Sequence, residues 1–217
     1  CYKFFAINKM PAPLLYLPFK IPVRYDLVQP LADWLDDDES QTAFGGSSAS
    51  SDDSPPSFML PKPTYNSVQC RSELLRVAAL RNCISEALMD SHQSALEEHQ
   101  MLRDCQDYHA TLLEFEKRGF PTGSADDENG IDLTWKGAFC ESELETHHTL
   151  LWDRACTLWN LAALLSAEAA IKSDETTKEG LKLAIRNLQQ AASHLSLCRQ
   201  LLDRGGAKLW YWRRSYP

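Results

Sequence analysis

The sequence predicts a mainly α-helical fold, a helical solenoid of antiparallel hairpins with a small N-terminal β-sheet. Residues 71–117 contain neither glycine nor proline, and their apolar residues recur at helical intervals. Residues 151–170 are apolar on almost every side, and residues 181–202 carry one apolar stripe. Two short segments alternate apolar and polar residues with the period of a β-strand. Helices therefore dominate the fold, and the strands contribute a minor sheet.

Composition limits the classes of function. The 217 residues are 44% hydrophobic, which is ample for one core. The formal net charge of -8 argues against a nucleic-acid partner, because binding to phosphates needs a basic surface. The seven cysteines are odd in number and form no C-x-x-C pair, which is typical of a reducing compartment. We expect a cytoplasmic protein whose association with membranes is indirect.

The first elements are predicted to be a strand and a short helix. Residues 15–23 alternate without a miss, and Pro18 and Pro22 fall on the face opposite the apolar side chains. Since proline has no N–H to donate to a neighbouring strand, this strand is expected at a sheet edge. Residues 27–35 are predicted to form a short amphipathic helix, with Pro30 in its first turn.

Changes of composition divide the chain into parts. An acidic, serine-rich segment buries too little apolar surface to offset the entropy of ordering it, so we predict a disordered loop there. The last stretch is aromatic and basic and loses the helical period; we interpret it as an irregular tail, with a membrane-surface anchor as the alternative. The predicted parts are an unassigned N-terminal edge (1–12), the first strand and short helix (13–35), the disordered loop (36–58), the helical part of the domain (59–203) and the tail (204–217).

Two long helices, rather than one, are predicted within residues 71–117. Asp90 or Ser91 offers a helix cap and a place for the chain to break. Gly119 and Pro121 end the second helix. The apolar residues at helical spacing are Leu74, Val77, Leu80, Ile84, Leu88, Ala95, Leu102, Tyr108 and Leu112.

A second strand is predicted at residues 131–135. Ile131, Leu133 and Trp135 lie on one side of this alternating segment. We expect it to pair with the strand at residues 15–23 in a small sheet.

The segment "LWDRACTLWNLAALLSAEAA", residues 151–170, predicts a helix buried among other helices. Charged Asp153, Arg154 and Glu168 leave too short an apolar stretch for a membrane-spanning helix. Small alanines allow neighbouring backbones to approach, while tryptophans and leucines fill the remaining space. We interpret the segment as core, with a site for a cofactor or ligand as the alternative.

A final helix is predicted after a short connection, in which Thr176 and Glu179 have the spacing of a capping box. Two long helices joined in this way form an antiparallel hairpin. The predicted buried stripe is Leu181, Ala184, Leu188, Ala191, Leu195, Cys198 and Leu202. The predicted outward residues are Lys182, Arg186, Gln189, Ser193 and Gln200.

Enzymatic signals are weak. Glu145 and His148 have the E-x-x-H spacing that would place both side chains on one helix face, but a di-iron site needs a second such motif and two further glutamates. The sequence has no G-x-S-x-G elbow, no glycine-rich phosphate loop and no cysteine with activating neighbours. We therefore predict a non-enzyme without a cofactor. A metal-dependent oxidoreductase that uses Glu145 and His148 is the alternative.

Four segments, in order along the chain, resemble the N-terminal half of a Bro-one domain of the ALIX and PalA family. They are "LLYLPFKIPVRYDLVQPLADWL", "IDLTWKGAF", "LWDRACTLWNLAALLSAEAA" and "EGLKLAIRNLQQAASHL", and the resemblance covers about residues 13–202. It implies a banana-shaped solenoid with tetratricopeptide-like helix hairpins. It also implies an adaptor of the ESCRT machinery that is recruited to endosomes. Endosomal sorting, ambient-pH signalling and Rho-linked roles all remain open.

The resemblance also implies a partner and two site residues. Family members bind the C-terminal amphipathic helix of the filament-forming ESCRT-III subunit in a groove, most of which lies in the half of the domain beyond this match. Lys182 matches a lysine on the rim of that groove, and Lys178 stands where relatives carry an acidic residue. A reversed charge at the rim changes which partner helices are favoured. For both lysines, a solvated helix face without a partner is the alternative.

Overall fold

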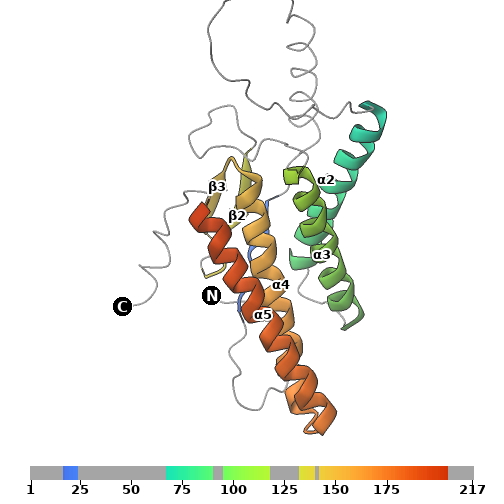
Figure 1. Ribbon diagram of the computed structural model, residues 1–217, viewed down its shortest axis with the longest axis vertical. Coiled ribbons are helices and arrows are strands. Elements are labelled where there is room, and N and C mark those ends of the chain that lie inside the picture. Colours follow the sequence, from blue (N-terminus) through green and yellow to red (C-terminus); the bar gives the residue numbers. More distant parts are fainter. Residues whose placement is uncertain (1–16, 24–66, 90–94, 118–131, 140–141, 205–217) are drawn as a thin grey trace, which may run out of the picture.

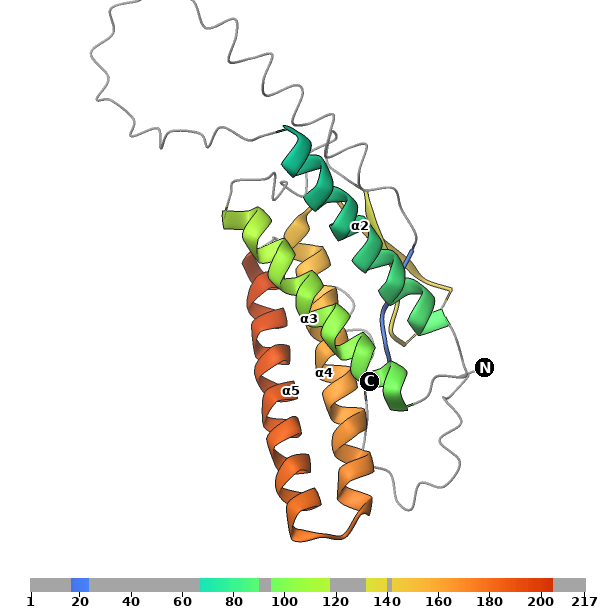
Figure 2. The same ribbon diagram turned by 90° about the vertical axis from the view of Figure 1, so that its right-hand side faces the viewer.

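The computed structural model describes residues 17–23, 67–89, 95–117, 132–139 and 142–204. In this part of the chain, helices α2 (Ser67–Met89) and α3 (Ala95–Lys117) form one antiparallel pair. Helices α4 (Leu150–Asp174) and α5 (Lys178–Arg204) form another (Figures 1 and 2). The two pairs lie side by side, because α3 packs against α4. The prediction of a mainly α-helical fold built from hairpins is confirmed.

A three-stranded antiparallel sheet accompanies the helices, as predicted. Its order is β1 (Ile21–Pro22), β2 (Leu133–Lys136) and β3 (Leu144–His147). The first strand lies at the edge and pairs with the second, with Pro22 opposite Trp135. The predicted pairing is therefore confirmed. Strand β3 was not predicted, because its sequence, LETH, shows little apolar alternation.

The first strand is shorter than the predicted segment 15–23. Within residues 17–23, only Ile21 and Pro22 are in the sheet; the backbone of residues 17–20 is bound by side chains of α4 instead. The Asn160 side chain accepts from Lys20 N (2.8 Å) and donates to Lys20 O (2.7 Å). Trp159 Nε1 donates to Pro18 O (2.7 Å). Since prolines interrupt the row of N–H donors, α4 takes the place of a neighbouring strand.

Helix α2 ends at Met89 and α3 begins at Ala95, so the predicted break between two helices is confirmed. Their buried side chains include most of the predicted apolar set: Leu74, Val77, Ile84, Leu88, Tyr108 and Leu112.

Several predictions lie outside the described residues. They concern the helix at 27–35, the acidic loop at 36–58, the caps Asp90 and Ser91, and the tail from residue 205 on.

Helix α4 is the centre of the molecule. Every residue from Asp153 to Ser166 is buried, which confirms the prediction of a helix enclosed by other elements. Helices α3 and α5 and strand β2 all pack against it. At its start, Thr149 Oγ1 accepts a hydrogen bond from Trp152 N (3.2 Å), which satisfies one of the free N–H groups of the first turn.

The predicted capping box at the start of α5 is wrong by one residue. Thr177, not Thr176, is the cap: its Oγ1 accepts from Gly180 N (2.9 Å). Thr176 instead adopts a left-handed conformation (φ 50°) in the tight connection between α4 and α5. The box cannot form, because the residue three positions after Thr177 is glycine rather than glutamate.

Gly180 is required at this turn, and we expect Gly180→Ala to lower the free energy of unfolding by about 1–3 kcal/mol. An added Cβ would lie 2.7 Å from the backbone oxygen of Lys172 and 2.9 Å from Thr177 Oγ1, so the α4–α5 connection would have to shift. The gain in helix propensity, about 1 kcal/mol, is too small to compensate. Urea unfolding measures the change. Gln190→Ala, at an exposed position of α5, is the matched control and should change stability by less than about 0.5 kcal/mol.

The predicted buried stripe of α5 is wrong at two positions. Ala184, Ala191, Cys198 and Leu202 are buried as predicted. Leu181 and Leu188, however, are 48% and 40% exposed. In the described part of the chain α5 packs mainly against α4, so a single neighbour covers only the narrow side that carries the alanines. The five predicted outward residues are exposed, as expected.

Candidate partner-binding surface

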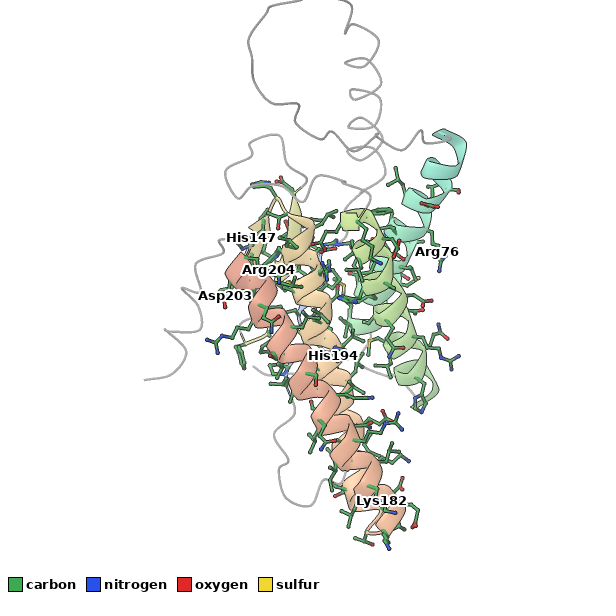
Figure 3. All side chains as sticks on the ribbon, viewed as in Figure 1. Arg76, His147, Lys182, His194, Asp203 and Arg204 are labelled. Atoms are coloured by element: carbon green, nitrogen blue, oxygen red, sulfur yellow. The ribbon has the colours of Figure 1, made fainter. Side chains whose placement is uncertain are left out.

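Lys178 and Lys182 both lie exposed near the start of α5. Because they are four residues apart on one helix, their side chains occupy the same side. Lys182 projects from the end of the α4–α5 hairpin, away from α2 and α3 (Figure 3). The structure therefore brings the two predicted site residues together on one surface.

An apolar stripe runs beside the two lysines. Leu181, Ile185 and Leu188 follow the helical spacing i, i+4, i+7 and are 48%, 57% and 40% exposed. We call these three residues together with Lys178 and Lys182 the α5 surface. Contiguous exposed apolar side chains of this kind mark an interaction site more often than isolated ones do.

Sequence reasoning misses the apolar part of this surface. The periodicity assigns Leu181 and Leu188 to the core and Ile185 to neither side. The signal is present in Ala184 and Ala191, because small residues at helical spacing mark the side where two helix backbones approach closely. One neighbouring helix covers that side but does not reach the large apolar residues next to it, so these stay exposed.

The α5 surface has the chemistry to bind an amphipathic helix. Three aliphatic side chains at successive turns match the apolar stripe of such a helix. The two ammonium groups beside them favour a partner with carboxylates one turn apart, and such charges fix register more than they add affinity.

Glu145 and His148 do not form the predicted pair on a helix. Glu145 is in strand β3, and His148 follows the end of that strand, so the helical premise of the metal site is wrong. Glu145 forms an ion pair with Lys20. His148 Nδ1 lies 2.8 Å from Asp132 Oδ1. Within the described residues, no three His, Cys, Asp or Glu side chains are grouped so as to hold a metal ion.

Two aromatic contacts surround the Glu145–Lys20 pair. The Lys20 ammonium lies 5.1 Å from the centre of the Trp152 ring. The centres of the His147 and Trp152 rings are 4.0 Å apart. Burial lowers the pKa of Lys20, but its electrostatic interactions, with the Glu145 carboxylate among them, outweigh burial, so the pKa is raised overall. Burial lowers the pKa of His147. This group of residues attaches β1 and β3 to α4.

A buried polar cluster fixes the position of the helices that carry the α5 surface. The Asp153 carboxylate accepts from Trp135 Nε1 (2.6 Å) and from the Tyr108 hydroxyl, and it pairs with Arg81 (3.4 Å). The Arg81 guanidinium also donates to the backbone oxygens of Val23 and Thr134. Arg81 and Asp153 are 1% and 0% exposed. The Arg81–Asp153 pair and its hydrogen bonds thus connect α2, α3, α4, β2 and the residue that follows β1.

The environment of this cluster shifts two pKa values. Burial lowers the pKa of Arg81, but its electrostatic interactions, first among them the one with the Asp153 carboxylate, outweigh burial, so the guanidinium pKa is raised overall. Burial and the Asp153 charge raise the pKa of Tyr108 well above its ordinary value. The arginine and the phenol therefore keep their protons at neutral pH, as donors to a carboxylate require.

Four cysteines in the described residues are free thiols: Cys83, Cys105, Cys156 and Cys198. Burial raises the pKa of the last three, that of Cys198 to about 11. A protonated, buried thiol is a poor nucleophile, so these three cysteines have a packing role. In the same part of the chain, no helix combines the length and the apolar character needed to cross a bilayer.

Comparisons with known proteins agree with this architecture. A model of the BRO1-like domain family matches residues 62–205. Two solved structures share the fold: ALIX in complex with the SIVmac239 late domain PYKEVTEDL, and the ALIX BRO1 domain in complex with CHMP4C. Each is 21% identical with a TM-score of 0.57 over 84% of this chain. The chain spans 23% of the first and 44% of the second. Among curated protein sequences there is no match.

Proposed function

Because the chain belongs to the BRO1-like domain family, we propose that it is a non-enzymatic adaptor that binds an amphipathic helix of an ESCRT-III subunit. The ALIX BRO1 domain, which shares the fold, binds CHMP4C in one solved complex. The observation that carries the proposal for this chain is the α5 surface, where an exposed aliphatic stripe lies beside two lysines. Recruitment to endosomes from the cytoplasm would follow from such a partner.

The proposal assigns a role to each part of the α5 surface. Leu181, Ile185 and Leu188 are the apolar anchors, because helix-in-groove recognition depends on side chains at successive turns. Lys178 and Lys182 select a partner helix with acidic residues beside its own apolar stripe. The chain spans less than half of the ALIX BRO1 domain, so α5 would supply one wall of the binding site.

A fluorescence anisotropy titration tests the proposal. The labelled probe is the C-terminal helix of an ESCRT-III subunit, and the expected result is saturable binding in the micromolar range. Ile185→Asp should weaken binding by at least about tenfold, because it places a charge in the apolar contact. Lys182→Glu should also weaken it, and the effect should diminish at high salt.

The control is Lys117→Glu, which makes the same charge change at an exposed lysine of α3, remote from α5 in sequence. It should leave the dissociation constant within about twofold of the unmodified protein. Equal loss of affinity in Lys117→Glu and Lys182→Glu would show that binding depends on net charge alone. Saturable binding that survives Ile185→Asp would assign the partner to a different surface.

The metal-dependent oxidoreductase alternative has lost its structural premise. It required Glu145 and His148 on one face of a helix, and Glu145 lies in a strand where it is paired with Lys20. In a strand, residues three apart point to opposite faces.

A further inference from the structure

Basic side chains from three helices act on one another electrostatically where α3 and α5 pack against α4. Arg154 of α4 and His194 of α5 act on His109 of α3, and Arg204 of α5 acts on Arg154; we call these four residues the basic cluster. His194 and Arg204 lie on the half of α5 that is next to α3, not at the end that carries Lys182 (Figure 3). The cluster is therefore separate from the α5 surface.

Negative charge at the basic cluster is limited. Arg154 is 5% exposed and forms an ion pair with Glu116 of α3. The adjacent carboxylate of Asp153 is occupied by Arg81, Tyr108 and Trp135. Among the described residues, the groups that act on His109 are Arg154 and His194, both of which are basic.

Two nitrogen atoms of the basic cluster are buried without a hydrogen-bond partner among the described residues. They are His109 Nε2 and Arg154 Nε. In the protonated imidazolium of His109, the Nε2–H group has no acceptor there, and a second positive charge acts on the Arg154 guanidinium. Both consequences destabilise the protonated form in the folded state.

The pKa values are in line with this geometry. Burial, Arg154 and His194 lower the pKa of His109 to about 4, and burial lowers that of His194. In an unfolded chain both groups titrate near pH 6.5. Because the pKa of each histidine is lower in the folded than in the unfolded state, each histidine stabilises the fold above about pH 6.5. For His109, that contribution is lost as the pH falls from there towards about 4.

We propose that the basic cluster makes the packing of α3 and α5 against α4 sensitive to acid. Protonation of His109 and His194 adds like charge at the point where three helices meet, and Glu116 cannot neutralise all of it. Because both histidines bind protons more readily once these contacts open, mild acid loosens the C-terminal half of α5. The α4–α5 connection, with its neutral Thr177 cap, is unaffected. The cluster is a pH-dependent contact built into the hairpin.

Two measurements on the full chain test this proposal. In an NMR titration, His109 should titrate well below pH 6, whereas an unperturbed histidine titrates near about 6.5. In urea unfolding, the equilibrium constant for unfolding should rise at least about tenfold between about pH 7.5 and pH 5. The His109→Gln/His194→Gln variant should lose most of this rise, since glutamine does not titrate.

His99→Gln is the matched control and should keep the full pH dependence. Amide exchange, corrected for its intrinsic pH dependence, should accelerate in residues 194–204 more than in residues 178–186. A normal His109 titration, or an unchanged pH dependence in the double variant, would overturn the proposal. The NMR titration uses the unmodified protein, so it tests the proposal even if the double variant fails to fold.

Discussion

Asp153→Ala is expected to lower the free energy of unfolding by about 3–5 kcal/mol. The substitution removes the carboxylate that pairs with Arg81 and accepts from Trp135 and Tyr108. All of these groups are buried, so the guanidinium would be left as an uncompensated charge in the core. Because Arg81 also donates to the backbone oxygens of Val23, which follows β1, and of Thr134 in β2, the attachment of the sheet to the helices should weaken too.

Urea unfolding followed by circular dichroism measures this loss. Asp174→Ala, at an exposed position at the other end of α4, removes the same side chain without a buried partner and should cost less than about 0.5 kcal/mol. Arg81→Met in the Asp153→Ala background should recover part of the stability, because it removes the unpaired charge. If the Asp153→Ala variant proves as stable as the Asp174→Ala control, the central role of Asp153 is contradicted.

Trp159→Ala is expected to cost about 3–5 kcal/mol as well, for a different reason. The Trp159 side chain is 2% exposed and packs edge-to-face against Phe139, with ring centroids 6.0 Å apart. Its Nε1 also donates to Pro18 O (2.7 Å). The substitution leaves a large cavity in the core and removes one of the hydrogen bonds that hold residues 17–20 against α4.

Trp159→Phe separates the two contributions. It keeps most of the buried ring but leaves Pro18 O without its donor, so the expected cost is about 1–3 kcal/mol. Hydrogen exchange at Lys20, whose N–H is bound by Asn160, reports whether residues 17–20 detach from α4. Equal stability losses in the two variants would indicate that the hydrogen bond, rather than the buried ring, dominates.

Much of the fold could be predicted from the sequence, because periodicity reports which side chains one element can bury. The absence of glycine and proline in residues 71–117 predicted two helices, and α2 and α3 are found there. Leu133 and Trp135 predicted a strand with one buried face, and both residues are fully buried in β2. The strand β3 escaped prediction because its ladder with β2 depends on backbone hydrogen bonds that any sequence can form.

The candidate site was predicted less completely. Lys178 and Lys182 were identified through a family resemblance, and the structure places both on the exposed side of α5. The spacing of Glu145 and His148 suggested a pair only on the assumption of a helix. In a strand, side chains three residues apart point to opposite faces. The basic cluster gave no sequence signal, since His109, Arg154 and His194 come from three different helices.

The sequence by itself determined the type of each described helix, the burial of α4 on every side and the pairing of the first two strands. Only the tertiary structure decided which large apolar residues of α5 stay exposed, which carboxylate faces Arg81, and which basic groups meet between α3, α4 and α5. The physical reason is that periodicity describes a single element, whereas exposure and charge pairing depend on how many neighbours that element has and on what they carry. On α5, the same leucine spacing that predicts a buried stripe produces an exposed apolar surface, because one neighbouring helix covers only the side lined by Ala184 and Ala191.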